Sequence, residues 1–270
     1  MRPSESFVEL PAGPFRLLTW GDGRETVLFL HGLTAVADVW GPAVEHLPAA
    51  RRYVALDQRG HGQSPRPPTG YGTGAFVRDT LAVIRRLGAP VHLVGHSMGA
   101  RVAMLLAARH PAVLRSVAVV DIGPEASKAN IETTVAGIGS RREEFESEAE
   151  AVAFAFRNRA PTPGAVALFL ARLEPTGNGR LRWRAPLEAL EQTVRNHRSR
   201  GYWREWRSIE LPAVFIHAGT SNEVSVAIAD RMCAENRRVR FERYESVGHN
   251  IPLVAPERLA RSLERFWESV

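Results

Sequence analysis

The sequence predicts an α/β fold with a mostly parallel sheet that is interrupted by one helical insertion. Short apolar runs alternate with longer segments of helical period over residues 26–120, and the alternation returns after residue 209. Buried strands that alternate with helices are typical of a parallel sheet covered on both faces. Between residues 123 and 208 helix-like segments occur without an apolar strand. The observations therefore predict one core with an insertion.

The expected core begins with an antiparallel hairpin around the turn Pro11-Ala-Gly-Pro14 and continues with strands that each precede a helix. Gly88 ends one of these helices, Pro111 stops another, and Pro256 opens the last one. Eight strands result, at residues 7–10, 15–20, 26–30, 53–56, 91–94, 117–120, 213–217 and 240–244, with core helices at residues 40–47, 73–87, 98–109 and 226–233.

The insertion follows the sixth strand. Its helix-like segments are residues 143–157, 166–173 and 187–198, and breaks that contain Pro and Gly separate them. An insertion at the carboxyl end of a strand lies over the edge where α/β enzymes keep their catalytic groups. We therefore expect residues 1–123 and 209–270 to form the core, and residues 124–208 to form a helical cap, or lid.

Composition excludes several classes of function. The net charge is +6, but the basic residues are scattered and accompany no nucleic-acid motif, so we expect no nucleic-acid partner. Cys233 is the only cysteine, and the histidines lack metal-ligand spacing, so we expect no disulfide, no metal and no cofactor. Without a signal peptide or a membrane-length apolar run, the sequence predicts a cytoplasmic protein, monomeric or homodimeric, that does not bind membranes.

The stretch Gly95-His-Ser-Met-Gly99 lies between an expected strand and an expected helix. A sharp strand-to-helix turn exposes the hydroxyl of Ser97 above the sheet, and small flanking residues let two chain segments pass closely. The helix N-terminus favours the negative charge that develops during acyl transfer. In this context the motif predicts that Ser97 is a nucleophile.

At this point the chain resembles the α/β-hydrolase family along nearly its whole length. The resemblance implies that the backbone N–H groups of Leu33 and Met98 form an oxyanion hole, and that His249 is the general base. His31, His61, His96 and His217 are expected to be structural. Beside the serine motif, the resemblance depends on His31-Gly-Leu-Thr34, Asp57-Gln-Arg-Gly-His-Gly-Gln-Ser64 and Val247-Gly-His-Asn250.

Two residues compete to be the acid of the triad. A right-handed crossover from the Ser97 strand places the strand that ends at Asp121 alongside it, about 4.8 Å away. Glu223 lies in the loop after the next strand, where Asn222 occupies about the position of an aspartate in many family members. Some members take the acid from the strand after the nucleophile helix, which favours Asp121 and leaves Glu223 in reserve.

Within the family, the core resembles the (E)-2-(acetamidomethylene)succinate hydrolase and meta-cleavage C–C hydrolase group. This resemblance implies a cofactor-independent serine hydrolase of a small carbonyl substrate: an ester, an amide, a lactone or an activated C–C bond. The alternatives are a weakly catalytic ligand-binding relative that acts as a sensor, and a haloperoxidase- or perhydrolase-like activity.

Candidate substrate-binding residues have structural alternatives. Arg101 lies one helical turn after Ser97 and faces either a substrate carboxylate or a structural ion pair. Phe156, Trp183 and Trp203 in the insertion either line an apolar pocket or form the core of the cap.

Overall fold

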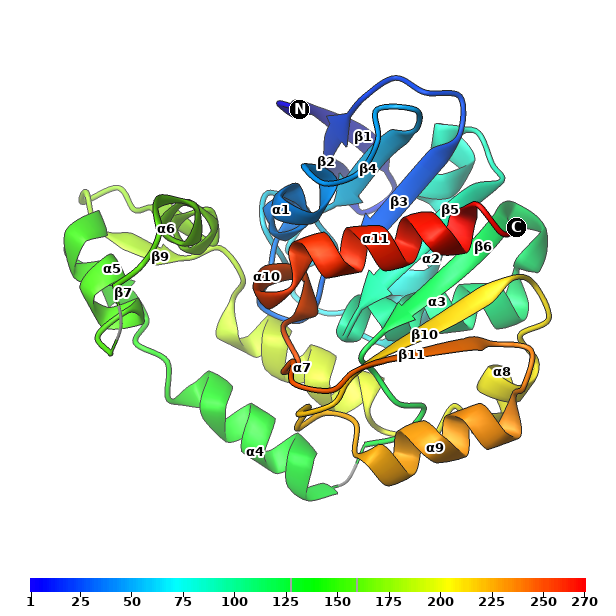
Figure 1. Ribbon diagram of the computed structural model, residues 1–270. Coiled ribbons are helices and arrows are strands. Elements are labelled where there is room, and N and C mark those ends of the chain that lie inside the picture. Colours follow the sequence, from blue (N-terminus) through cyan, green and yellow to red (C-terminus); the bar gives the residue numbers. More distant parts are fainter. Residues whose placement is uncertain (127, 159) are drawn as a thin grey trace.

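The computed structural model describes residues 1–126, 128–158 and 160–270, and its centre is an eight-stranded sheet (Figure 1). The strand order is β1-β2-β4-β3-β5-β6-β10-β11. Within this sheet only the pairs β1–β2 and β2–β4 are antiparallel, which confirms the predicted mostly parallel sheet of eight strands. The strands are β1 (Ser4–Leu10), β2 (Gly13–Trp20), β3 (Thr26–Leu30), β4 (Arg52–Leu56), β5 (Val91–His96), β6 (Leu114–Val120), β10 (Ala213–Ala218) and β11 (Arg240–Tyr244).

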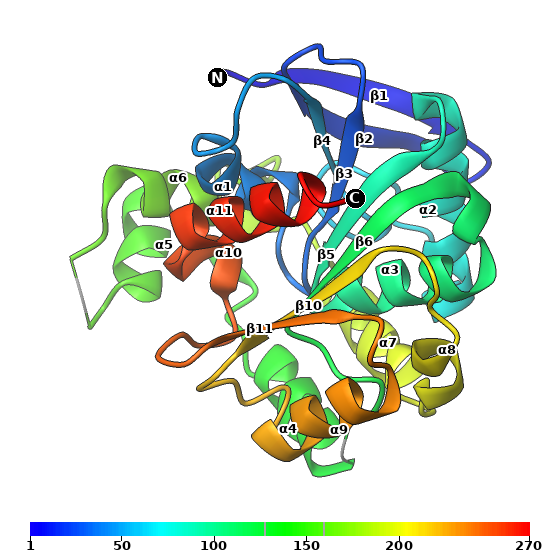
Figure 2. The same ribbon diagram turned by 45° about the vertical axis from the view of Figure 1, so that its right-hand side comes forward.

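Helices cover the sheet on both faces, and two apolar cores result (Figure 2). Alternate residues of β3 point to opposite cores, so Leu28 and Leu30 enter one while Val27 and Phe29 enter the other. The first core includes α2 (Thr73–Leu87), α3 (Met98–Arg109), α8 (Trp203–Arg207) and α9 (Val226–Glu235). The second includes η1 (Ala37–Trp40), α1 (Gly41–Val44), α10 (Ile251–Val254) and α11 (Pro256–Trp267).

The segment between β6 and β10 is not purely helical, contrary to the sequence prediction. It contains a three-stranded antiparallel sheet of order β7-β9-β8, whose strands are too short to show a period of two. The helix α4 (Lys128–Gly139) also went unpredicted. The remaining elements are β7 (Glu144–Phe145), α5 (Glu148–Ala155), α6 (Pro163–Leu170), β8 (Leu173–Pro175), β9 (Leu181–Trp183) and α7 (Leu187–His197).

Part of this segment stands apart from the sheet. Figure 1 shows α5, α6, β7 and β9 as a lobe at the left, whereas α7 runs beneath the core. The lobe has an apolar cluster of its own, made of Phe145, Ala151, Phe169 and Leu173. None of the described helices is long and apolar enough to cross a lipid bilayer.

Candidate active site

The turn that carries Ser97 joins β5 directly to α3, and close packing forces glycine on either side of it. A Cβ on Gly95 would overlap the backbone of Gly99, and a Cβ on Gly99 would lie 2.7 Å from the carbonyl oxygen of His31. Ser97 itself has φ 53°, a conformation that costs energy for a residue with a side chain. The close approach of two chain segments therefore accounts for the Gly-x-Ser-x-Gly spacing.

Backbone strain is concentrated around this turn. Among the described residues, the non-glycine residues with positive φ are Thr34 at 66°, Ser97 at 53° and Asp121 at 49°. Each of them follows the carboxyl end of a strand, and the three strands β3, β5 and β6 are neighbours in the sheet. Strained residues that collect at one sheet edge are typical of a functional site.

Ser97, His249 and Asp121 form a continuous hydrogen-bonded relay. The Ser97 Oγ lies 3.0 Å from His249 Nε2, and His249 Nδ1 lies 2.8 Å from an Asp121 carboxylate oxygen. With the ring proton on Nδ1, the imidazole donates to Asp121 and accepts from the serine hydroxyl. This arrangement can move a proton from Ser97 to His249 while Asp121 stabilises the charged imidazole.

Asp121 is fully buried, and neighbouring donors hold its carboxylate in place. Ala218 N donates to Oδ1 at 2.9 Å, and Ser221 Oγ donates to Oδ2 at 2.6 Å, on the oxygen that His249 also contacts. The role of Ser221 was not predicted, because nothing in the pattern Gly-Thr-Ser-Asn-Glu distinguishes this hydroxyl from its neighbours. The loop after β10 thus supplies a donor that orients the acid.

His96 supports His249 from the other side. Its Nε2 lies 2.8 Å from the His249 carbonyl oxygen, and the two rings have centroids 4.8 Å apart. Burial lowers the pKa of His96 to about 3, so the ring is neutral and its Nε2–H donates to the carbonyl. His96 therefore fixes the backbone that carries His249, a contact that the sequence did not indicate.

Leu33 and Met98 lie beside the serine, as the oxyanion-hole prediction requires. Both line the pocket that contains Ser97, and neither backbone N–H has an acceptor among the described residues. Gly32 lies against the nucleophile, since a Cβ there would be 3.1 Å from Ser97 Cβ. A tetrahedral oxyanion needs two N–H donors of this kind, and the roles of Leu33 and Met98 as those donors stay a prediction.

Glu223 lies in an ion pair instead of near the imidazole. Its carboxylate is 3.0 Å from Arg198 Nη2, and both side chains are largely buried. The backbone carbonyl oxygen of the neighbouring Asn222 accepts a hydrogen bond from Asn130 Nδ2 at 3.2 Å. The structure thus brings Asp121, and not Glu223, into contact with His249.

The pocket at Ser97 is narrow and partly charged. Its cavity volume is only about 20 Å³, within about 290 Å³ of space that includes open solvent between the nucleophile turn and α7. Its wall is formed by Leu33, Ser97, Met98, Arg101, Ile122, Thr193, Val194, His197 and Arg198. The segment between β6 and β10 therefore forms one side of the pocket.

Arg101 lies in this wall, but its guanidinium donates hydrogen bonds to backbone carbonyl groups. Nη1 donates to the His197 carbonyl at 2.7 Å, and Nη2 donates to the Gly123 carbonyl at 3.0 Å. Burial lowers its pKa to about 10. Among the described residues Arg101 does not form the ion pair that was its structural alternative, because it meets two carbonyl groups in place of a carboxylate. Its contact with a substrate carboxylate stays a prediction.

The three aromatic candidates lie outside the pocket at Ser97. Trp203 is part of the main core, and its Nε1 donates to Glu125 at 2.6 Å. Phe156 packs on Phe169 in the lobe, with ring centroids 5.9 Å apart. Trp183 also packs in the lobe, against Phe169 at 5.7 Å. Each of them packs in a core instead, which was the structural alternative.

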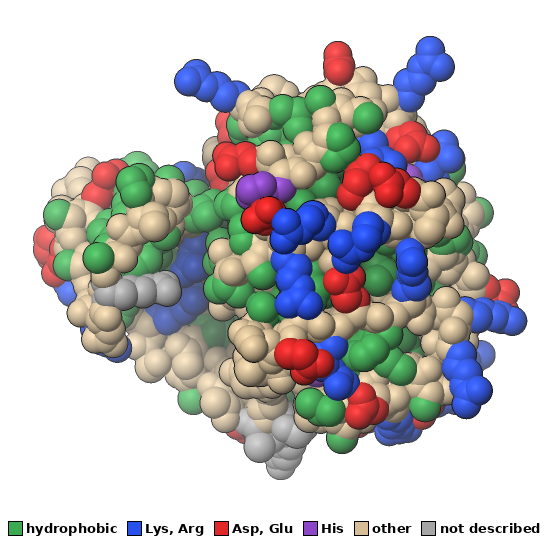
Figure 3. All heavy atoms as spheres, in the orientation of Figure 1, with side chains coloured by type: hydrophobic (Ala, Val, Ile, Leu, Met, Phe, Trp, Pro, Cys, Tyr) green, Lys and Arg blue, Asp and Glu red, His purple; other side chains and the backbone are tan. Residues whose placement is uncertain are grey.

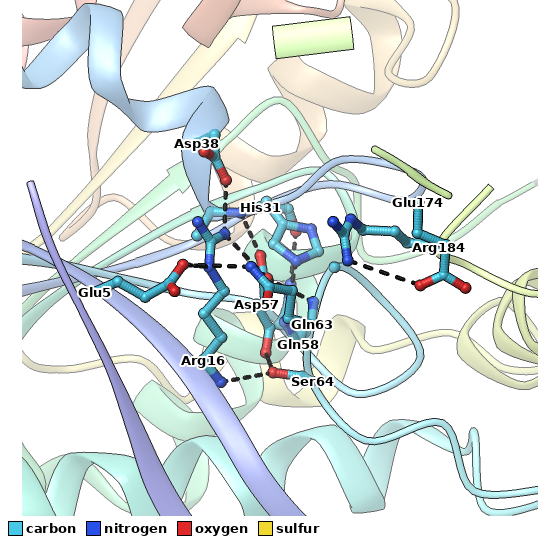
Figure 4. Close-up of polar contacts among 12 residues, drawn as sticks. Glu5, Arg16, His31, Asp38, Asp57, Gln58, Gln63, Ser64, Glu174 and Arg184 are labelled. Carbon is cyan, nitrogen blue, oxygen red and sulfur yellow. Dashed lines mark hydrogen bonds and ion pairs between the residues drawn. The ribbon is translucent and has the colours of Figure 1, made fainter. Parts of the chain in front are cut away.

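A buried polar network holds the loops that flank the pocket (Figure 4). The Asp57 carboxylate accepts from the N–H groups of Ala37 at 2.6 Å and Gln63 at 2.9 Å, and from Arg16 at 3.2 Å. Gln58 N donates to His31 Nε2 at 3.0 Å, and burial lowers the pKa of His31 to about 4. A neutral, hydrogen-bonded His31 is a structural residue, in agreement with the prediction.

Known proteins resemble this chain over most of its length. A protein-family model, described as alpha/beta hydrolase family, matches residues 27–262 of this chain. The chain is 29% identical over 244 residues to the 2-(acetamidomethylene)succinate hydrolase of Mesorhizobium japonicum, and the match covers 89% of this chain and 87% of that protein. It is 25% identical over 254 residues to the (E)-2-((N-methylformamido)methylene)succinate hydrolase of Acinetobacter baylyi, with 92% of each chain covered.

A solved structure agrees with these matches. The crystal structure of E-2-(acetamidomethylene)succinate hydrolase has a TM-score of 0.90 with this chain at 25% identity, and the match covers 99% of this chain and 100% of that one. The similarity therefore includes the segment between β6 and β10 as well as the sheet.

Proposed function

We propose, given that the chain belongs to the alpha/beta hydrolase family, that it is a serine hydrolase that cleaves small carbonyl compounds through an acyl-enzyme. The observation that carries this proposal is the relay in which His249 lies 3.0 Å from Ser97 and 2.8 Å from Asp121. Ser97 is the nucleophile, His249 the general base and Asp121 the acid.

The reaction begins when the Ser97 oxygen attacks the substrate carbonyl while its proton passes to His249 Nε2. The tetrahedral oxyanion accepts hydrogen bonds from the N–H groups of Leu33 and Met98, and removal of one such donor typically costs about 10²–10³ in rate. His249 then gives the proton to the leaving group, which departs as an alcohol or an amine. Water, activated by the same imidazole, hydrolyses the acyl-serine and restores Ser97.

The segment of residues 124–208 serves as the cap of this site. Its helix α7 contributes Thr193, Val194 and His197 to the pocket wall beside Ser97. A cap in this position selects substrates and limits the access of water.

The names of the relatives suggest the substrate classes to test first. Both are hydrolases of succinates that carry an acetamido- or N-methylformamido-methylene group. Initial rates on a panel of small esters, lactones and N-acyl enamines would test the proposal. We expect turnover by the native chain and a loss of at least about 10³-fold in Ser97→Ala and in His249→Ala. Turnover that persists in Ser97→Ala would contradict the proposal.

A further inference from the structure

His197 stands out among the described residues because both polar atoms of its side chain are buried and unpaired. Neither ring nitrogen, Nδ1 or Nε2, has a hydrogen-bond partner among the residues that the structure describes. The residue is 3% exposed, and it lines the pocket that contains Ser97. A buried imidazole ordinarily donates from one nitrogen and accepts at the other, so two unmet nitrogens at a pocket wall point to a ligand.

Packing holds the His197 ring in place at the end of α7. The ring meets Phe76 of α2 edge to face, with centroids 4.6 Å apart and planes at 89°. Arg101 Nη1 donates to the His197 carbonyl oxygen at 2.7 Å, which ties the end of α7 to the nucleophile helix α3. The unmet nitrogens therefore belong to a ring that is fixed against the core.

His61 accounts for one of the two nitrogens at most. Its Nε2 is also buried without a partner among the described residues, and His61 is close enough to affect the pKa of His197. One water molecule between the two rings would satisfy one nitrogen of each. Because the nitrogens of an imidazole point in divergent directions, that water cannot reach the second nitrogen of His197. The second nitrogen is left for a group in the pocket.

The His197 ring is uncharged. Burial, followed by the charges of Arg101, His61 and Arg198, lowers its pKa to about 3. A neutral imidazole forms ordinary hydrogen bonds and lacks the charge that favours a carboxylate. Arg101 Nε, also buried without a partner among the described residues, adds a single N–H to the same wall. Single N–H donors suit one oxygen atom, such as that of an ether, a hydroxyl or a carbonyl group.

The space beside this wall has room for one small group. The cavity volume is about 20 Å³, and about 10–15 Å³ is enough for a group of the size of water. Leu33, Ile122 and Val194 add apolar surface to the wall. Figure 3 shows a hollow between the lobe and the core, and in Figure 1 the chain enters α7 beside it. A short acyl chain with one polar oxygen matches this combination of size and polarity.

We propose that His197 donates a hydrogen bond to an uncharged oxygen atom in the acyl group of the substrate, and that it thereby selects short acyl groups that carry such an oxygen. The inference rests on the proposed function, since it names the substrate class of the same site. An apolar acyl group in the pocket leaves the His197 nitrogen buried and unpaired. A site of this kind disfavours the analogue that lacks the oxygen.

Two esters, p-nitrophenyl methoxyacetate and p-nitrophenyl butanoate, test the inference. They share a leaving group and differ by an ether oxygen in place of a methylene group. The measured quantity is the ratio of their kcat/KM values in each variant, so that the intrinsic reactivity of the esters cancels. We expect this ratio to fall by about 10-fold in His197→Phe and in His197→Leu, the effect of one neutral hydrogen bond. An unchanged ratio in either variant would overturn the inference.

His92→Phe is the matched control. His92 is a second buried histidine, whose pKa burial lowers to about 4, but its Nδ1 lies 2.8 Å from Ser116 Oγ. It lies near the start of β5, at the opposite end of the strand from Ser97. We expect the ester ratio to stay unchanged. A fall as large as that in His197→Phe would show that selectivity responds to any buried histidine, and would overturn the inference.

Urea unfolding distinguishes a ligand-binding histidine from a structural one. Phenylalanine at position 197 keeps an aromatic ring against Phe76 and removes two unmet nitrogens, whereas His92→Phe leaves Ser116 without its partner. We therefore expect the unfolding midpoint to fall less in His197→Phe than in His92→Phe. A larger fall in His197→Phe, together with an unchanged ester ratio, would assign His197 a structural role and overturn the inference.

A binding measurement separates this inference from the proposed function. NMR titration of Ser97→Ala with methoxyacetamide and with butanamide requires no turnover. We expect methoxyacetamide to bind about 10-fold more tightly, and this preference to vanish when His197→Phe is added. Turnover of both esters without the preference would overturn the role of His197 alone. The preference without turnover of either ester would overturn the hydrolase function alone.

Discussion

Asp121→Asn tests the acid of the proposed triad more sharply than any other single substitution. The side chain is fully buried and keeps its shape in the variant, so an amide oxygen can still accept from Ala218 N. The amide nitrogen, however, would face His249 Nδ1, where Oδ2 now accepts at 2.8 Å. A donor in this position forces the imidazole proton onto Nε2, and the ring can then no longer accept the proton of Ser97.

The expected loss follows from this change of tautomer. In serine proteases the equivalent change lowers kcat by about 10⁴, or roughly 5 kcal/mol of transition-state stabilisation. Folding should suffer much less, because the amide nitrogen can donate to Ser221 Oγ, which now lies 2.6 Å from Oδ2. We expect the free energy of unfolding to fall by less than about 2 kcal/mol, the scale of one altered hydrogen bond.

The assay compares kcat for the best ester of the panel in the native chain, in Asp121→Asn and in Glu223→Gln. Glu223→Gln weakens the ion pair to Arg198 at the edge of the pocket, and we expect it to cost less than about 10-fold. Urea unfolding of each variant confirms that it is folded. If Asp121→Asn kept more than about a tenth of kcat, or if Glu223→Gln lost as much as Asp121→Asn, the assignment of the acid would be refuted.

Three further predictions concern the supports of the site. Ser221→Ala removes the 2.6 Å donor to Asp121 and should lower kcat about 10-fold in steady-state assays; an unchanged kcat would exclude an orienting role. Gly99→Ala places a Cβ 2.7 Å from the His31 carbonyl oxygen and should lower the free energy of unfolding by more than about 3 kcal/mol, measured with urea. Buried neutral histidines should make stability fall with acid: their pKa in the fold lies below the ordinary 6.5, so stability present above pH 6.5 is lost as pH falls toward 4, by up to about 1.4 kcal/mol per pH unit for each ring. Urea midpoints that stay constant from pH 7 to pH 5 would contradict this effect, which is expected from His31, His61, His96 and His197.

The fold was predictable because its signals are local. Apolar strands such as residues 26–30 and 91–96 precede amphipathic helices, and glycine or proline marks their ends. The short strands of the lobe were not predictable, because two or three residues cannot show a period of two. Helix α4 combines β-branched residues with glycines, which weakens its helical signal.

The residues of the candidate site were likewise predictable only where the signal is local in the sequence. Ser97 and His249 lie in motifs, and the choice of Asp121 depended on the expected order of the strands together with the resemblance to family members that take the acid from this strand. The roles of Ser221 and His96 depend on which atoms the fold brings within about 3 Å, which no spacing along the chain reveals.

The central claim is that Ser97 is a nucleophile activated by His249 and Asp121. Intact-mass spectrometry after treatment with a fluorophosphonate tests it most directly, because this reagent phosphonylates only an activated serine. We expect one adduct per chain, located on Ser97, none in Ser97→Ala, and much slower labelling in Asp121→Asn. A native chain that remains unlabelled, or an adduct that persists in Ser97→Ala, would contradict the claim.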